Sequence, residues 1–137
     1  MRTSGKLESE RPDDGVAAFF DGFVAAFATF DAARVAALYR LPVVAMQADG
    51  TVQCFATRAD LERAFQAYLD GYRRDGASTC RWRDLDVAPI GGQAALATVT
   101  WDVLDAAGAQ IRSWRESYNL VRTESGWRAM ASIDHVP

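Results

Sequence analysis

The order of its secondary-structure patterns is what most constrains the fold of this 137-residue chain. Three helical patterns fill the first half, with a short hairpin between the second and the third, and consecutive strand patterns fill the second half. The strand candidates are 79–88, 93–104, 109–122 and 127–133, with glycine-containing turns between them. This order predicts an α+β domain in which three helices pack in a strongly curved, mixed but mostly antiparallel sheet, a cone-shaped α+β barrel.

The length suits one domain with its own core, and we expect that domain to span residues 13–137. Residues 1–12 are polar and rich in charge, which favours a mobile N-terminal tail. They lack the apolar segment of a signal peptide, and no apolar stretch of the chain reaches the ~20 residues that span a bilayer. The sequence therefore predicts a cytoplasmic protein with no membrane partner.

The overall charge argues against a nucleic-acid partner. The formal net charge is −3, whereas nucleic-acid-binding domains normally carry a clustered positive charge. Arg73, Arg74, Arg81 and Arg83 do form a local basic cluster. We interpret it as solvated surface, with the first two arginines matching the negative end of a helix dipole.

Cysteine and histidine are too few for a structural metal site. Cys54 and Cys80 are the only cysteines, they form no C-x-x-C motif, and His135 is the only histidine. We expect two reduced, partly buried thiols and neither a metal nor a cofactor, although both cysteines lie on predicted strands and could pair.

The helical half has clear start and stop signals. The first helix is expected to begin near Pro12 and to bury one apolar stripe. Asp31 is the expected N-cap of a shorter helix that Leu41-Pro42 ends, and Thr57 that of a long helix that Gly76 closes. Asp49-Gly50 predicts a hairpin between strands 43–47 and 51–55. The stripe consists of Val16, Phe19, Phe20, Phe23, Val24 and Phe27.

This order of elements is similar to that of the nuclear-transport-factor-2-like superfamily, over roughly residues 13–135. The residues that carry the resemblance are Leu38 to Pro42, Asp49-Gly50, Thr57 with Leu61 and Phe65, Ala95 to Trp101, Asp105 to Gly108, Tyr118 through Arg128, and Ile133 to His135. The superfamily includes SnoaL-like polyketide cyclases and ketosteroid isomerases. The resemblance implies a pocket between the helices and the concave sheet face, and a homodimer across the sheet. The scaffold hosts unrelated activities, so it implies no single reaction.

Ketosteroid isomerase chemistry is not expected here. It needs a carboxylate base, which in that family follows the tyrosine corresponding to Tyr39 at a fixed interval, and this chain has Met46, Gln47 and Ala48 there. The first helix also carries only phenylalanine as its aromatic residue, so the tyrosine donor of that family is missing.

The SnoaL-like cyclases use a pair of the Asp and His type, for which Asp102, Glu116, Asp134 and His135 are the catalytic candidates. Strand alternation places Asp102 on the outward face, toward solvent or a dimer partner. Glu116 shares a more buried face with aromatic residues, beside Arg112 or another arginine, and is the best single candidate. For His135, at the end of the last strand, we favour an exposed or hydrogen-bonded residue over a catalytic one.

Two functional hypotheses remain open. The first is a small-molecule-binding domain for an apolar or amphipathic ligand, with or without cyclase, hydratase or isomerase activity. The second is a non-catalytic dimerisation or protein-interaction module, in which the aromatic residues fill the cone and a polar outward face makes the contact. The expected pocket lining is Phe23, Phe27, Tyr39, Met46, Gln47, Phe65, Tyr68, Trp101, Trp114 and Tyr118.

Overall fold

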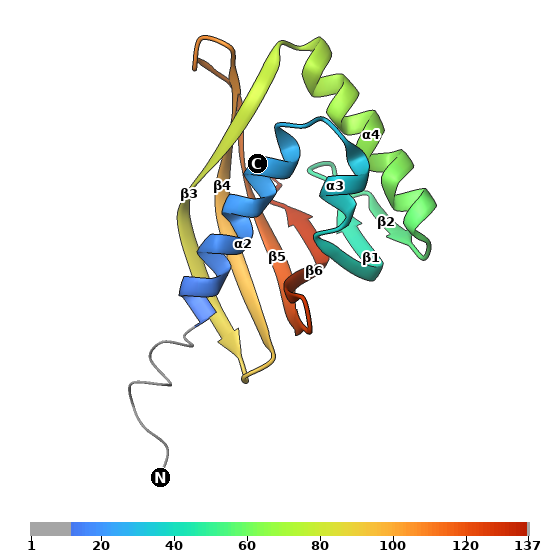
Figure 1. Cartoon of the computed structure of the whole chain (residues 1–137), viewed down its shortest axis with the longest axis vertical. Coiled ribbons are helices and arrows are strands. Elements are labelled where there is room, and N and C mark those ends of the chain that lie inside the picture. The colour runs from blue at the N-terminus through green and yellow to red at the C-terminus, as the bar shows by residue number, and fades with distance from the viewer. Residues whose placement is uncertain (1–11, 137) are drawn as a thin grey trace.

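The computed structural model describes residues 12–136 and consists of three helices and one six-stranded sheet (Figure 1). The predicted mobile tail, residues 1–12, lies outside the described part except for Pro12, which begins α2. In chain order the elements are α2 (Pro12–Phe27), α3 (Ala32–Ala36), β1 (Tyr39–Met46), β2 (Val52–Phe55), α4 (Arg58–Arg74), β3 (Ala77–Ile90), β4 (Ala94–Asp105), β5 (Gln110–Thr123) and β6 (Gly126–Asp134).

The sheet is mixed and open. Its strand order is β2-β1-β6-β5-β4-β3, and β1 with β6 is the one parallel pair among the described strands. Figure 1 shows α2 lying across the long strands β3, β4 and β5, while α3 and α4 lie beside β1 and β2. The predicted fold, three helices in a curved and mostly antiparallel sheet, is confirmed.

The core lies between the helices and the inner face of the sheet. On α2, Val16, Phe19, Phe20 and Phe27 are buried, as the apolar stripe predicts. On β4 the buried residues alternate in the predicted way and are Ala95, Ala97, Val99, Trp101 and Val103. One face of each long strand therefore turns toward the helices, and its side chains set the shape of the interior.

The predicted helix caps are present. The Asp31 carboxylate accepts a hydrogen bond of 2.9 Å from the backbone N–H of Ala33, and the Thr57 hydroxyl accepts one of 3.2 Å from that of Asp60. Each bond satisfies a donor that the first turn of a helix would otherwise leave open. After α4, Gly76 adopts a φ of +96°, a conformation that glycine reaches without steric cost.

The short helix ends earlier than predicted. It stops at Ala36, and β1 already begins at Tyr39, four residues before the expected start at Val43. The reason is a long-range pairing, because the Leu38 carbonyl accepts a hydrogen bond of 2.9 Å from the backbone N–H of Ala129 on β6. Pairing with a distant strand outweighs the local helical pattern here.

The two cysteines differ in exposure. Cys80 is buried on β3, Cys54 is exposed on β2, and both are free. The prediction of partial burial is therefore wrong for Cys54, because β2 is a short edge strand whose side chains are mostly exposed.

Among the described helices, none combines the length and the apolar character that crossing a membrane requires.

Candidate functional site

A cavity of about 400 Å³ lies between the helices and the inner face of the sheet. The structure places every side chain of the predicted lining around it: Phe23, Phe27, Tyr39, Met46, Gln47, Phe65, Tyr68, Trp101, Trp114 and Tyr118. The volume falls within the range of about 300–1,000 Å³ that is typical of ligand pockets. The cone is therefore not packed shut by its aromatic residues.

Several pairs of aromatic rings stand in the cavity wall. The ring centroids of Tyr39 and Phe65 lie 4.9 Å apart, and those of Phe23 and Trp101 lie 5.1 Å apart. Tyr72 and Trp114 stack with an interplanar angle of 9° and a centroid distance of 6.0 Å. Ring pairs at these separations stabilise one another, so the wall is apolar and well ordered.

Two carboxyl groups interrupt this wall. Glu116 on β5 and Asp134 on β6 are directly opposite one another in the sheet register, and both line the cavity. The indole N–H of Trp114 donates a hydrogen bond of 2.9 Å to Glu116 Oε1. Glu116 is 9% exposed, which makes it a buried carboxyl that faces a second carboxyl rather than a cation.

This arrangement favours the protonated form of the pair. Burial, and next the negative charge of Asp134, raise the pKa of Glu116 to about 8, and the Trp114 hydrogen bond only partly opposes them. Burial also raises the pKa of Asp134, while hydrogen bonding with Glu116 and the charge of Arg112 act in the other direction. The two groups therefore retain a proton at neutral pH, so one can act as an acid beside an ionised partner.

Phenol hydroxyls surround the carboxyl pair. The Tyr118 hydroxyl accepts a hydrogen bond of 2.8 Å from Trp101 Nε1, while that of Tyr39 has no hydrogen-bond partner among the described residues. Burial and then the charge of Glu116 raise the pKa of both tyrosines well above 10. Both phenols therefore stay neutral, and the Tyr39 hydroxyl can donate a hydrogen bond to a ligand.

The opening of the cavity lies along α4. The exposed lining residues are Ala67, Tyr68 and Asp75 from α4 and its C-terminal end, together with Ala48 and Arg112. At this rim the Tyr68 hydroxyl lies 3.3 Å from Gln53 Oε1 and donates a hydrogen bond to it. A molecule that enters the cavity therefore passes between α4 and the N-terminal end of β5, which carries Arg112.

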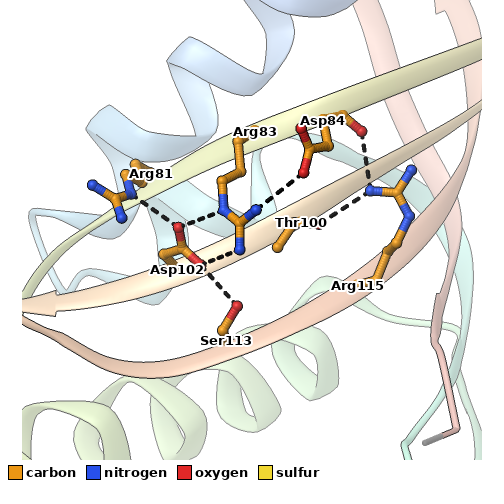
Figure 2. A network of polar contacts seen from close by, with 7 residues as sticks. All are labelled: Arg81, Arg83, Asp84, Thr100, Asp102, Ser113 and Arg115. Carbon is orange, nitrogen blue, oxygen red and sulfur yellow. Dashed lines mark hydrogen bonds and ion pairs between the residues drawn. The ribbon is translucent and has the colours of Figure 1, made fainter.

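Asp102 lies on the face of the sheet that turns away from the cavity, as predicted, but it is not exposed to solvent. Its side chain is 0% exposed because Arg81 and Arg83 on β3 cover it, each with Nε 2.9 Å from Oδ2 (Figure 2). The Ser113 hydroxyl donates a further bond of 2.7 Å. Although burial alone would raise it, hydrogen bonds from Arg83, Ser113 and Arg81 hold the pKa of Asp102 at about 2.

This cluster corrects one prediction and adds to another. Asp102 is the buried carboxylate of an ion-pair cluster rather than a residue in contact with solvent. Arg81 and Arg83 lie on the solvated surface as predicted, with 56% and 49% of their side chains exposed, but they also pair with this carboxylate. Alternation predicted the face correctly, but it does not reveal which long side chains of the next strand fold over a residue. Arg115 extends the network through bonds to the Asp84 carbonyl and the Thr100 hydroxyl (Figure 2).

His135 also lies away from the cavity. It is exposed, and its Nε2 shares a hydrogen bond of 2.9 Å with the Ser117 hydroxyl on the outer face. Of the four catalytic candidates, the structure thus brings together Glu116 and Asp134 and separates them from Asp102 and His135. The predicted arginine beside Glu116 is replaced by Asp134, because the register of β6 on β5 sets these two carboxyls opposite one another.

The polar or aromatic lining residues that sequence reasoning missed include Tyr72, Arg112 and Ser132, together with Phe55 and Asp75. The signal for the first two was present, because Tyr72 continues the apolar spacing of α4 and Arg112 shares the inner face of β5 with Trp114 and Glu116. Ser132 gave no signal of its own.

Within residues 12–136, no cluster of His, Cys, Asp and Glu side chains is placed to hold a metal ion.

The comparisons with known proteins identify the family. The family described as "NTF2-like protein (DUF6841)" matches residues 10–137, which is nearly the whole chain. The chain belongs to this NTF2-like family. No curated protein matches it.

Solved structures share the NTF2-like fold at low sequence identity. An NTF2-like protein with a cystatin-like fold from Novosphingobium aromaticivorans has a TM-score of 0.76 and 15% identity, over 97% of this chain and 86% of its own. The protein Aln2 from a Streptomyces species has a TM-score of 0.73 and 19% identity, over 99% and 94%. A suggested dehydratase from Streptomyces avermitilis has a TM-score of 0.69 and 17% identity, over 93% and 99%. At these identities the likeness establishes the fold alone.

Proposed function

We propose that this NTF2-like protein binds a small, largely apolar molecule in its cavity and moves protons on it. Glu116 and Asp134 would be the acid–base pair of an isomerase, hydratase or SnoaL-like cyclase type of reaction. The observation that carries the proposal is the placement of these two carboxyls opposite one another in a largely apolar wall. Buried carboxyls with strongly shifted pKa values are typical of catalytic acids and bases.

In this proposal, the aromatic part of the cavity binds the ligand and the carboxyl pair transfers the protons. The paired rings of Phe23 with Trp101 and of Tyr39 with Phe65 would hold the apolar body of the ligand. A ligand oxygen near Glu116 would receive its proton, while an ionised Asp134 would accept one from a neighbouring carbon. The free Tyr39 hydroxyl is available as a further donor to that oxygen.

The alternative hypothesis of a filled cone has less support. The cavity is open along α4, and much of the polar outer face, including Asp102, Ser113 and Ser117, is hydrogen-bonded within the protein itself.

We also propose a homodimer that forms across the sheet. Exposed apolar residues on the outer face favour this contact: Val44, Leu96, Met130 and Ile133. Light scattering on the purified chain, giving the mass of one or two copies, tests it.

Proton exchange provides a direct test of the acid–base role. A panel of apolar ketones is first titrated against the protein, with the fluorescence of the lining residues Trp101 and Trp114 as the readout. Bound ketones are then incubated in D₂O, and exchange of the protons beside the carbonyl is followed by NMR. We expect Glu116→Gln and Asp134→Asn to stop the catalysed exchange while binding persists, because neither amide transfers a proton as a carboxyl does.

Glu124→Gln is the matched control, since Glu124 is exposed and does not line the cavity. It should leave both binding and exchange unchanged. Catalysed exchange that persists in Glu116→Gln and Asp134→Asn would overturn the catalytic role and leave a binding protein. A parent protein that binds none of the panel would count against the ligand-binding role itself.

A further inference from the structure

Arg112 lies at the mouth of the cavity, against two aromatic rings. It lies near the start of β5, it is exposed, and it lines the cavity together with the stacked rings of Tyr72 and Trp114. Its guanidinium carbon lies 5.5 Å from the centroid of Tyr72 and 6.0 Å from that of Trp114. The two rings thus support the cation at the rim through cation–π attraction.

The described residues offer no hydrogen-bond acceptor to this guanidinium. Within the described residues, Arg112 takes part in none of the ion pairs, and its side-chain contacts are with the two rings. A guanidinium that rests on aromatic rings keeps its N–H groups available at its edge, in the fork that matches a carboxylate or sulfonate. By contrast, Arg81 and Arg83 on the outer face are both occupied by Asp102.

We propose that Arg112 selects an amphipathic anion as the ligand, binding its acidic group at the mouth while its apolar ring system enters the cavity. This inference rests on the proposed function, because it names the class of molecule that the Glu116–Asp134 pair would act on. Binding to Arg112 would also orient the ligand, with its acidic end at the mouth and its uncharged end toward the carboxyl pair.

The positive charge in the cavity lining lies at the opening, on Arg112. Arg112 is the only positively charged residue in the lining of the described chain, and it stands at the opening, where it would repel an entering cation. The deeper Glu116–Asp134 pair shares a proton, and the charge of Arg112 also acts on Asp134. Asp75 also lies at the rim, which confines the acidic group to the side of the opening that carries Arg112.

Two fluorescent probes with the same ring system isolate the role of the charge. 8-Anilinonaphthalene-1-sulfonate is an anion, and N-phenyl-1-naphthylamine lacks its sulfonate. We expect Arg112→Gln to weaken binding of the sulfonate by about tenfold or more, the value of a lost charge-assisted hydrogen bond, and to change binding of the neutral probe less than about twofold. Arg112→Lys, which keeps the charge without the fork, should show a smaller loss.

Arg73→Gln is the matched control, because the Arg73 guanidinium also lies over a ring, 5.2 Å from the centroid of Phe30, but outside the cavity lining. It should alter neither affinity. If both probes bind and Arg112→Gln affects them equally or not at all, the anion inference is overturned while the proposed function stands. If neither probe binds the parent protein, the cavity is not a ligand site and both proposals fail.

Discussion

The indole N–H of Trp101 on β4 donates a hydrogen bond of 2.8 Å to the hydroxyl of Tyr118 on β5, and both side chains are almost fully buried. The bond joins two rings of the cavity wall from neighbouring strands. Among the described residues, the Tyr118 hydroxyl is the only hydrogen-bond partner of Trp101 Nε1. A buried indole N–H without an acceptor would be energetically costly.

Replacing Tyr118 by phenylalanine should therefore destabilise the protein. Tyr118→Phe keeps the ring but leaves Trp101 Nε1 without its acceptor, so we expect the free energy of unfolding to fall by about 1–3 kcal/mol. Urea unfolding measures this change. Tyr72→Phe is the control, because no hydrogen bond of the Tyr72 hydroxyl is found among the described residues, and equal losses in both variants would contradict the assignment.

Glu116 should make stability depend on pH in an unusual direction. Its pKa is about 8 in the folded protein against an ordinary value of 4.5, so between these pH values the unfolded chain loses a proton that the folded chain keeps. The free energy of unfolding should then decrease as the pH rises from about 4.5 to 8. Urea unfolding across this range should show that decrease in the parent protein.

The amide variant separates this effect from other titrations. Glu116→Gln cannot ionise and should match the parent near pH ~5 but be the more stable protein near pH ~9. Glu124→Gln, which changes an exposed carboxyl, should follow the parent throughout. A Glu116→Gln protein that loses stability equally at both pH values would show that Glu116 is ionised in the folded state.

Asp102 should contribute stability that disappears in acid. Its pKa of about 2 lies below the ordinary value of 3.8, so the contribution is complete above pH 3.8 and is lost as the pH falls through 2. We expect Asp102→Asn to cost about 1.5–3 kcal/mol at neutral pH and little near pH ~2, because it replaces the charged acceptor of two arginines. Denaturant unfolding at the two pH values measures this.

Asp84→Asn is the matched control for that variant. Asp84 also accepts a bond from Arg83, at 3.0 Å, but it is exposed, so the cost should stay below about 1 kcal/mol. Its φ of +56° is one that asparagine tolerates well, which keeps the backbone unchanged. If the two variants cost the same, the burial of Asp102 has no energetic consequence.

The Thr57 cap should stabilise α4 measurably. Thr57→Ala removes the acceptor for the backbone N–H of Asp60 and should lower the free energy of unfolding by about 1 kcal/mol. Thr57→Ser keeps an oxygen in place and should restore most of that loss. Thermal unfolding followed by circular dichroism compares the three proteins, and an unchanged Thr57→Ala would mean that water satisfies the donor equally well.

Local patterns in the sequence determined the elements and their inner faces. The phenylalanine spacing of α2, the caps at Asp31 and Thr57, and the alternation along β4 each reflect interactions within a few residues. These features predicted the fold and the aromatic lining, because a helix or strand with one apolar face can bury it in few ways. The lining residues that the patterns did not single out include polar ones, such as Arg112 and Ser132, and buried apolar ones, such as Val103.

Contacts between distant strands decided the chemistry of the site. The register of β6 on β5 sets Asp134 opposite Glu116, and a bulge in β3 between Arg83 and Asp86 accompanies the arginine cover over Asp102. Periodicity reveals which face a residue occupies but not which residue of another strand lies beside it, since bulges shift the register by single positions. The sequence alone therefore determined an aromatic cone, and only the tertiary structure placed a carboxyl pair in its wall and an arginine on stacked rings at its mouth.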